Sequence, residues 1–401
     1  MKPDPTSLAS ENGERRRPAG SVWRPAEHSS ANGSPQQCPS SPKSSIASIP
    51  LAIACSLILA AYPARAQQPA MDPVFAEWQA KANPAVEKAL AYLQRVQKAD
   101  GSFDGQYGNS VGVPALVGMA FLSKGHLPTD GPYTTALNRC IDFILASQKP
   151  DGLLEKGSGG SGPMYAHNIA TLFLSEASGM VDPERQIRIS AVLPKALALI
   201  LRAQAVPKDA NNRGGWRYHP GSRDSDTSCS GWALMALRSA KLNGAAIPDE
   251  AIRAALDYLH RHQKEKDGCF GYTGQSDKAL SLTGMGLLCL ELCGEHGSER
   301  TKRAADWLLR HFRELGGGQF AFYGNYYNAQ AMFQIGGRHW QEYANWMYAT
   351  YLPKQTQDGS WESHEAGRIY GTAMMVLAFT VPWRQLPIYQ RDETVDEEPS
   401  R

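Results

Sequence analysis

The chain has 401 residues, 42% of them hydrophobic, and a formal net charge of +2. A charge so close to zero, without a stripe of Lys and Arg, gives no case for a nucleic-acid partner. The length suits one helical domain behind a leader and does not require a second domain.

The first 66 residues are expected to be processed rather than folded. Residues 1–42 are rich in Ser, Pro, Asn and Arg and nearly free of large apolar residues, which predicts a disordered leader. Lys43 then precedes an apolar run from Ile46 to Ala61, which as a helix of about 24 Å is too short to cross a bilayer core. The segment 43–66 ends in Ala-Arg-Ala and so predicts a secretory signal cleaved after Ala66, with export to the periplasm or cell envelope. A core helix and an uncleaved anchor are the alternatives.

After a linker expected at 67–80, a short turn motif recurs six times. In each copy a helix ends near a Gln or Leu, a Gly turns the chain, and an apolar or aromatic residue follows. The turn glycines are Gly101, Gly152, Gly215, Gly268, Gly318 and Gly359, and the glutamines are Gln97, Gln148, Gln204, Gln263 and Gln357, the fifth copy being Gly317-Gly318-Gln319-Phe320. A period of about fifty residues is typical of repeat architectures.

Each repeat predicts two helices of different character. The segment before each turn is amphipathic, as in residues 248–263, and the segment after it is apolar almost all round, as in residues 232–237. The expected outer helices are 83–97, 133–148, 190–204, 248–263, 300–314 and 340–355, and the expected inner helices are 111–124, 166–178, 227–241, 279–293, 326–335 and 368–381.

The last inner helix is as apolar as the others, whereas an open solenoid would need a polar capping repeat at its end. The sequence therefore predicts an all-α fold, an α/α toroid of six helical hairpins over residues 81–390, followed by an acidic tail at 391–401.

The turns resemble the Gln-Trp repeats of terpene cyclases and the related repeats of protein prenyltransferase β subunits. In addition, Tyr326-Tyr327-Asn-Ala-Gln, Gly336-Gly337-Arg-His-Trp340 and Gly359-Ser-Trp361 look like segments of bacterial prenyltransferase/squalene-oxidase-repeat proteins. This resemblance covers residues from about 80 to 390 and implies the toroid; it does not assign a reaction.

Asp224 and Asp226 are the candidate catalytic residues. They lie in Arg223-Asp-Ser-Asp-Thr-Ser228, which resembles the Asp-x-Asp-Asp-Thr motif of squalene–hopene and class II diterpene cyclases. In either alignment one acid of that motif is missing, because Thr227 or Ser225 takes its place. The alternative is structural, with Asp226 or Ser225 capping the helix that starts here.

A second segment, Asp267-Gly-Cys269-Phe, looks like the zinc-binding segment of protein prenyltransferase β subunits. The position of the third ligand, a histidine in that family, matches Asn328 here, and an amide is a poor zinc ligand. We therefore expect no metal and no cofactor, and Asp267-Gly268 reads as ordinary turn chemistry.

In a toroid, the loops that lead into the inner helices form one mouth of a central cavity. The candidate ligand-binding residues at this mouth are His167, Trp216, Tyr218, Tyr326, Tyr327, Asn328, Trp361 and Tyr370, and further residues there are Asn109, Tyr165, His219, Asp226, Tyr272, Tyr323 and His364. Such a lining suits a hydrophobic or sugar-like ligand, but it also suits packed core. Arg213, Arg217 and Arg223 could meet a diphosphate, or form a solvated basic loop.

Three functions remain open on the sequence alone. The favoured one is an exported toroid that binds a small hydrophobic, isoprenoid-like ligand, with its catalytic status undecided because the acid motif is incomplete. The second is a non-catalytic binding or interaction protein of the cell envelope. The third is a polysaccharide lyase or carbohydrate binder. Peripheral contact with a membrane is compatible with the first two, and nothing in the sequence indicates an oligomeric state.

Overall fold

The computed structural model describes residues 73–105, 107, 110–157, 162–275, 279–317 and 320–390. The predicted leader (1–42), signal segment (43–66) and acidic tail (391–401) lie outside these residues. The part of the chain that is described contains helices and a few isolated β-bridges but no strand.

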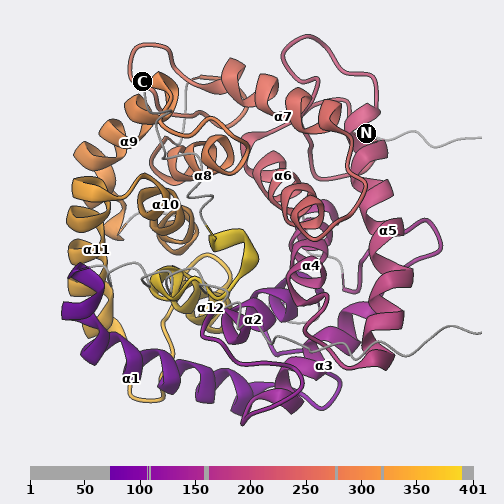
Figure 1. Cartoon of the computed structure of the whole chain (residues 1–401), viewed down its shortest axis with the longest axis vertical. Helices are drawn as coiled ribbons and strands as arrows, with labels where there is room; N and C mark the ends of the chain where they lie inside the picture. The colour runs from indigo at the N-terminus through magenta and orange to yellow at the C-terminus, as the bar shows by residue number, and fades with distance from the viewer. Residues whose placement is uncertain are drawn as a thin grey trace, which may run out of the picture. The chain divides into compact units, whose positions relative to one another are not determined.

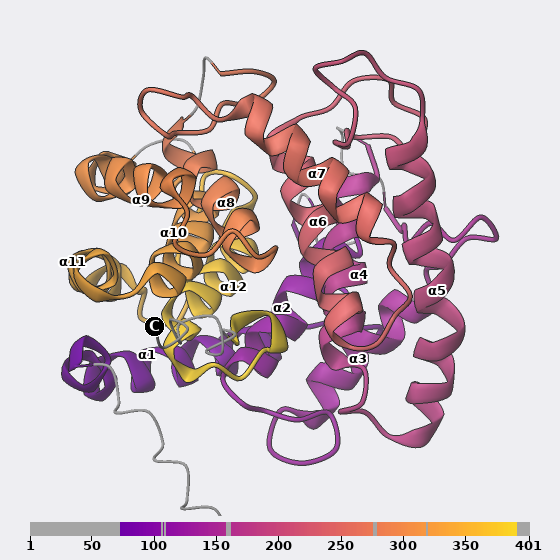
Figure 2. The same cartoon turned by 45° about the horizontal axis from the view of Figure 1, so that its top comes forward.

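The helices alternate between an outer and an inner ring, and the expected all-α toroid is confirmed (Figure 1). The outer helices are α1 (Pro73–Val96), α3 (Thr134–Leu145), α5 (Pro183–Ala205), α7 (Asp249–His262), α9 (Glu299–His311) and α11 (Gly337–Tyr351). The inner helices are α2 (Gly112–Ser123), α4 (Met164–Ala177), α6 (Thr227–Leu242), α8 (Ala279–Leu292), α10 (Ala321–Ile335) and α12 (Gly367–Phe379). Figure 2 shows the same alternation from a second direction.

The ring is closed. Each inner helix packs against the next, and α12 returns to pack against α2. In the outer ring, α11 packs against α1, where the Trp78 indole donates to the Asn345 side chain at 2.7 Å and stacks on Tyr348 at 5.7 Å. Trp78, which makes this contact, lies in the first turns of α1. Because α1 begins at Pro73, the prediction that residues 67–80 form a linker is wrong from Pro73 onward.

A side-chain amide links five of the repeats to the repeat that follows. In five repeats the glutamine at the end of the outer helix donates to the carbonyl of its own turn glycine and to a carbonyl of the following outer helix. The inter-repeat bonds are Gln97 to Ala136, Gln148 to Val192, Gln204 to Ala251, Gln263 to Arg300 and Gln355 to Ala85, all between 2.8 and 3.0 Å. The last of these joins the sixth repeat to the first and so helps close the ring.

The turn glycines sit against the same neighbouring helices. A Cβ on Gly101, Gly152, Gly214 or Gly359 would lie 2.0–2.4 Å from a carbonyl oxygen of the next outer helix. For Gly359 that oxygen belongs to Lys88 of α1, and its φ of +99° also favours glycine. Glycine is therefore needed because two backbones meet there.

Two assignments within the repeats need correction. In the last copy the bridging amide is Gln355, whereas Gln357, two residues later, is exposed. In the third copy the glycine against the next helix is Gly214, with φ +89°, not Gly215. The fifth copy cannot be compared in this way, because Gly318 and Gln319 lie outside the described residues.

The apolar or aromatic residue after each turn is a wedge between outer and inner helices. Phe103, Leu153, Trp216, Phe270 and Trp361 are all buried. A backbone N–H of this segment donates to a side chain on the inner helix in four repeats: Leu154 to His167, Trp216 to Ser230, Phe270 to Thr283, and Trp361 to Thr372. These bonds fix each wedge and contribute to architecture rather than to a binding surface.

The segment after α12 runs across the carboxyl ends of the inner helices. It contains two 3-10 turns, Val381–Trp383 and Pro387–Tyr389. The backbone N–H of Ile388 donates to the buried Glu176 carboxylate at 3.1 Å, and Ser239 donates to the same group. Burial raises the pKa of Glu176 to about 7. This segment covers the end of the ring opposite the first turns of the inner helices.

None of the helices in the described ranges is both long and apolar enough to span a bilayer.

Candidate functional site

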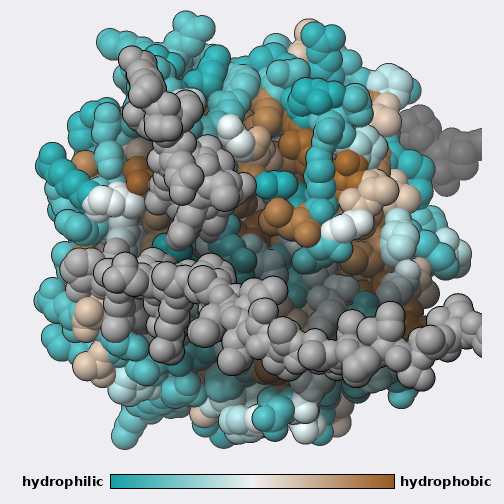
Figure 3. Space-filling view, in the orientation of Figure 1, coloured by the Kyte–Doolittle hydropathy of each residue, from teal (hydrophilic) through white to brown (hydrophobic). Residues whose placement is uncertain are grey.

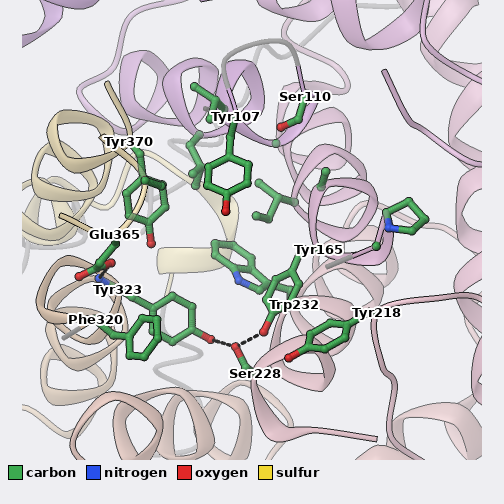
Figure 4. A pocket seen from close by; sticks show the side chains of 18 of the residues that line it. Tyr107, Ser110, Tyr165, Tyr218, Ser228, Trp232, Phe320, Tyr323, Glu365 and Tyr370 are labelled. Atoms are coloured by element: carbon green, nitrogen blue, oxygen red, sulfur yellow. Dashed lines mark hydrogen bonds between the residues drawn. The ribbon is translucent and has the colours of Figure 1, made fainter. Parts of the chain in front are cut away.

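A cavity of about 400 Å³ opens among the first turns of the inner helices and the loops that lead into them. Its wall is largely aromatic (Figure 4): the rings belong to Tyr107, Tyr165, Tyr218, Trp232, Tyr272, Phe320, Tyr323 and Tyr370. Apolar side chains such as Val113, Leu116 and Ile169 fill the spaces between them. In the space-filling view, hydrophilic side chains cover the rim of the ring and apolar ones show through toward its middle (Figure 3).

A hydrogen-bonded triad holds part of this wall in place. The Tyr165 hydroxyl donates to Ser228 Oγ at 2.6 Å, and Ser228 is also hydrogen-bonded to the Tyr323 hydroxyl (Figure 4). These three residues come from α4, α6 and α10, so the triad ties together helices that are far apart in sequence. Burial raises the pKa of both tyrosines, which keeps their hydroxyls neutral.

Glu365 is a carboxylate in the cavity wall, on the loop before α12. Its oxygens accept from the backbone N–H groups of Phe322 at 2.9 Å and Tyr323 at 3.3 Å, in the first turn of α10. The hydroxyl of Tyr370 adds a further hydrogen bond. Burial raises the pKa of Glu365, and the N–H groups oppose that shift. The carboxylate thus complements the positive end of α10, which has no cap from its own N-cap side chain.

Asp226 caps α6, as the structural alternative predicted. Its carboxylate accepts from the backbone N–H of Cys229 at 2.7 Å, and its second oxygen lies 3.4 Å from Nη1 of Arg217. Burial raises the pKa of Asp226 to about 7, although the Cys229 N–H and the Arg217 charge both oppose the shift. Asp226 is fully buried and does not line the cavity.

Arg217 separates the two candidate acids from the cavity. Its guanidinium lies 3.3 Å from exposed Asp224 and stacks over the rings of Tyr218 and Tyr272, at 4.5 and 5.4 Å from their centroids. The predicted catalytic residues Asp224 and Asp226 are therefore brought together around an arginine, behind the tyrosines of the wall. This arrangement is an ion-pair cluster that fixes the start of α6.

Of the eight predicted ligand-binding residues, two line the cavity and six do not. Tyr218 and Tyr370 line the cavity, and so do Tyr165, Tyr272 and Tyr323. Six others do not: His167, Trp216, Tyr326, Tyr327, Asn328 and Trp361. The tryptophans are wedges whose Nε1 groups donate to helix carbonyls, from Trp216 to Ile200 and from Trp361 to Tyr351.

The remaining four of these residues pack inside the ring. His167 accepts from the Leu154 N–H and faces the Ala196 carbonyl, and burial lowers its pKa to about 4, so it is neutral. Tyr326 stacks on Trp232, with Tyr327 edge-on to the same ring. Asn328 lies against Gly284, where a Cβ would come within 2.0 Å of its Oδ1.

Within the described residues, no cluster of three or more His, Cys, Asp or Glu side chains is arranged to hold a metal ion. Five thiols fall in this part of the chain and all are free: Cys140, Cys229, Cys269, Cys289 and Cys293. Four of the five are buried.

The sequence did not point to Trp232, Ser228 or Glu365. Trp232 was read as part of a helix buried on every side, and it is 1% exposed. It nevertheless lines the cavity. Depth along the helix does not distinguish it, because Tyr326 is likewise the sixth residue of its inner helix and is packed. The sequence carries no signal that separates the two.

The comparisons with known proteins agree with this architecture. No protein-family model matches the chain. A stretch of 200 residues, 49% of the chain, is 26% identical to the drimenyl diphosphate synthase of Streptantibioticus cattleyicolor and covers only 33% of that enzyme.

Two kinds of solved structure share the fold. The type II terpene cyclase MstE from Scytonema, solved with geranylgeranyl dihydroxybenzoate, matches 78% of this chain and 100% of its own, with a TM-score of 0.51 and 15% identity. An α-1,6-mannanase from Salegentibacter, solved with α-1,6-mannotriose, matches 75% of this chain and 98% of its own, with a TM-score of 0.56 and 9% identity. The protein is thus a terpene cyclase-like α/α toroid in its fold, a fold that it also shares with a mannanase.

Proposed function

We propose that this protein binds a hydrophobic, isoprenoid-like ligand in the central cavity of the toroid. The observation that carries the proposal is the cavity of about 400 Å³ lined by eight aromatic rings. Its volume falls in the range of about 300–1,000 Å³ typical of small-molecule sites, and such sites combine apolar walls with a few polar groups. The ligand of MstE, a geranylgeranyl dihydroxybenzoate, is of this kind.

The proposal does not include a diphosphate clamp. Arg217 is engaged by Asp224 and Asp226, and Arg213 and Arg223 are exposed and do not line the cavity. Proteins often bind a phosphate group through an arginine whose guanidinium donates two parallel hydrogen bonds to it. Among the described residues of the wall, Lys156 is the one cationic side chain, and it lies over the ring of Phe143 at 4.4 Å.

Obstructing the cavity should weaken ligand binding. Ala366 lines the cavity at its rim, so Ala366→Trp should obstruct it and weaken binding of farnesol or geranylgeraniol at least roughly tenfold, about 1.4 kcal/mol. Titration calorimetry on the full-length chain measures this. The matched control is Ala91→Trp on the exposed face of α1, which should bind like the wild type. Equal binding by the two variants, or no binding by the wild type, would refute the proposal.

A carbohydrate ligand is the second candidate, because the mannanase shares the fold and the cavity wall holds two carboxylates, Glu155 and Glu365. Glycosidases use two carboxyl groups on either side of the scissile bond. Here Glu155 is paired with Lys149, and Glu365 is held by the N-terminus of α10, which makes this candidate weaker. Titration with α-1,6-mannotriose in the same experiment decides between the two ligand classes.

We also propose that the protein is exported, on the basis of its apolar run and the Ala-Arg-Ala sequence that ends at Ala66. Expression of the full chain in a Gram-negative host should yield a periplasmic or envelope-associated protein that begins at Gln67. N-terminal sequencing of the fractionated protein measures this, and a cytosolic product that still begins near Met1 would contradict it.

A further inference from the structure

The floor of the cavity carries an indole N–H group that donates to none of the described residues. Trp232 lines the cavity and is 1% exposed, and within the described part of the chain its Nε1 makes no hydrogen bond. Figure 4 shows its ring in the middle of the site, between Tyr107 and Tyr323. In the free protein, water in the cavity can pair with this N–H. A ligand that displaces the water leaves the donor unpaired, at a cost of about 1–3 kcal/mol, unless the ligand itself supplies an acceptor.

The other fully buried tryptophans behave differently. Trp216 and Trp361 donate to helix carbonyls at 2.8 and 2.7 Å. Trp340 makes no conventional hydrogen bond either, but it lies edge-on to Phe333, with 83° between the rings, and lines neither of the two described cavities. Only at Trp232, among these four, does an unpaired indole meet open space.

The Trp232 ring is also fixed in orientation. It stacks on Tyr326 at 5.5 Å with 16° between the planes, and Tyr327 meets it edge-on at 5.3 Å. The preceding residue, Gly231, packs so closely on Met285 that a Cβ would lie 2.1 Å from its sulfur, which fixes α6 against α8. A donor held in place before binding adds affinity without an ordering cost.

The hydroxyls around the ring are already engaged. Tyr165 donates to Ser228, Ser228 is hydrogen-bonded to Tyr323, and the Tyr323 hydroxyl lies 3.7 Å from Met285 Sδ. None of these three hydroxyls accepts a hydrogen bond from Trp232 Nε1. Trp232 Nε1 remains the donor available at the floor.

We propose that Trp232 donates a hydrogen bond to an oxygen atom of the ligand, so that the ligand is an oxygenated isoprenoid and not a pure hydrocarbon. The oxygen can be that of an ether, a carbonyl or a hydroxyl, since all three accept. This inference rests on the proposed ligand-binding function and specifies the chemistry of that ligand where it reaches the cavity floor.

The test compares two probes of equal shape, farnesyl methyl ether and the hydrocarbon in which a methylene replaces its oxygen. The wild type should bind the ether roughly fivefold tighter, because one hydrogen bond contributes about 1 kcal/mol net. Trp232→Phe removes the N–H and keeps an aromatic ring, so it should bring the ratio of the two affinities close to one. Trp346→Phe, on the outer helix α11, is the matched control and should keep the wild-type ratio.

The outcomes separate the two proposals. If both probes bind the wild type equally, or if the preference survives in Trp232→Phe, the role of Trp232 is refuted while ligand binding stands. If neither probe binds, both proposals fail. Should Trp232→Phe not fold, an NMR spectrum of wild-type protein with ¹⁵N-labelled indoles decides: one tryptophan signal should move with the ether and not with the hydrocarbon. Identical spectra for the two complexes would overturn the inference.

Discussion

Gly359→Ala should lower the free energy of unfolding by about 2–4 kcal/mol. The new methyl group strains the backbone at this residue and also collides with α1, where the last repeat meets the first. Gly359 has φ +99°, and its new Cβ would lie 2.4 Å from the Lys88 carbonyl oxygen. That oxygen belongs to the backbone of α1 and cannot rotate away. Each kcal/mol lost from the free energy of unfolding should lower the melting temperature by roughly 2–4 °C or somewhat less in a chain of this size.

The matched control is Gly131→Ala. Gly131 has a similar φ, +104°, but a Cβ there would meet nothing within 4 Å. It should cost about 1–2 kcal/mol, the penalty for the backbone conformation alone. Thermal and urea unfolding of both variants measure the difference. Equal losses would show that contact between the first and last repeats adds nothing to stability.

Arg217→Met should destabilise the protein by about 2–4 kcal/mol at pH 8, because it leaves the buried Asp226 carboxylate without its cationic partner. Methionine retains much of the apolar stem, so the loss reflects charge more than packing. The loss should shrink as the pH falls toward 5.5. Without Arg217 the pKa of Asp226 rises further above its unfolded value, and the folded state then takes up a proton that the unfolded chain does not.

The double variant Arg217→Met/Asp226→Asn tests the cause. An amide carries no charge and still caps α6, so this variant should recover most of the lost stability at pH 8. Asp226→Ala, which removes the cap, should melt lower than Asp226→Asn. Urea unfolding at pH 5.5 and 8 measures all of these. A loss that does not depend on pH, or that Asp226→Asn fails to repair, would count against an ion-pair role for Arg217.

The free energy of unfolding of the wild type should also fall as the pH rises. Burial raises the pKa of Asp226 and of Glu176 to about 7, above their ordinary values of 3.8 and 4.5. The stability that this protonation adds is fully present below the unfolded pKa values and is lost as the pH rises through about 7.

The architecture was predictable because its determinants are local and repeated. Four of the described turns place a glycine where two backbones meet, and five outer helices end near a glutamine whose amide reaches the next repeat. Those requirements recur about every fifty residues, so they show in the sequence. The same periodicity misled the search for a site. Three of the predicted ligand-binding residues occupy positions that are equivalent from repeat to repeat: Trp216, Trp361 and His167. The structure places all three outside the cavity.

By itself, the sequence determined the alternation of amphipathic and apolar helices and the closed all-α ring, and it offered the helix cap at Asp226 as an alternative to a catalytic role. These follow from hydrophobic periodicity and from residues close together in the chain. The tertiary structure decided which rings face open space. Tyr165, Trp232, Tyr323 and Tyr370 come from four different inner helices and meet only when the ring closes, whereas Tyr326 and Tyr327 are packed against Trp232. That distinction depends on how neighbouring inner helices pack in the closed ring, which no local pattern records.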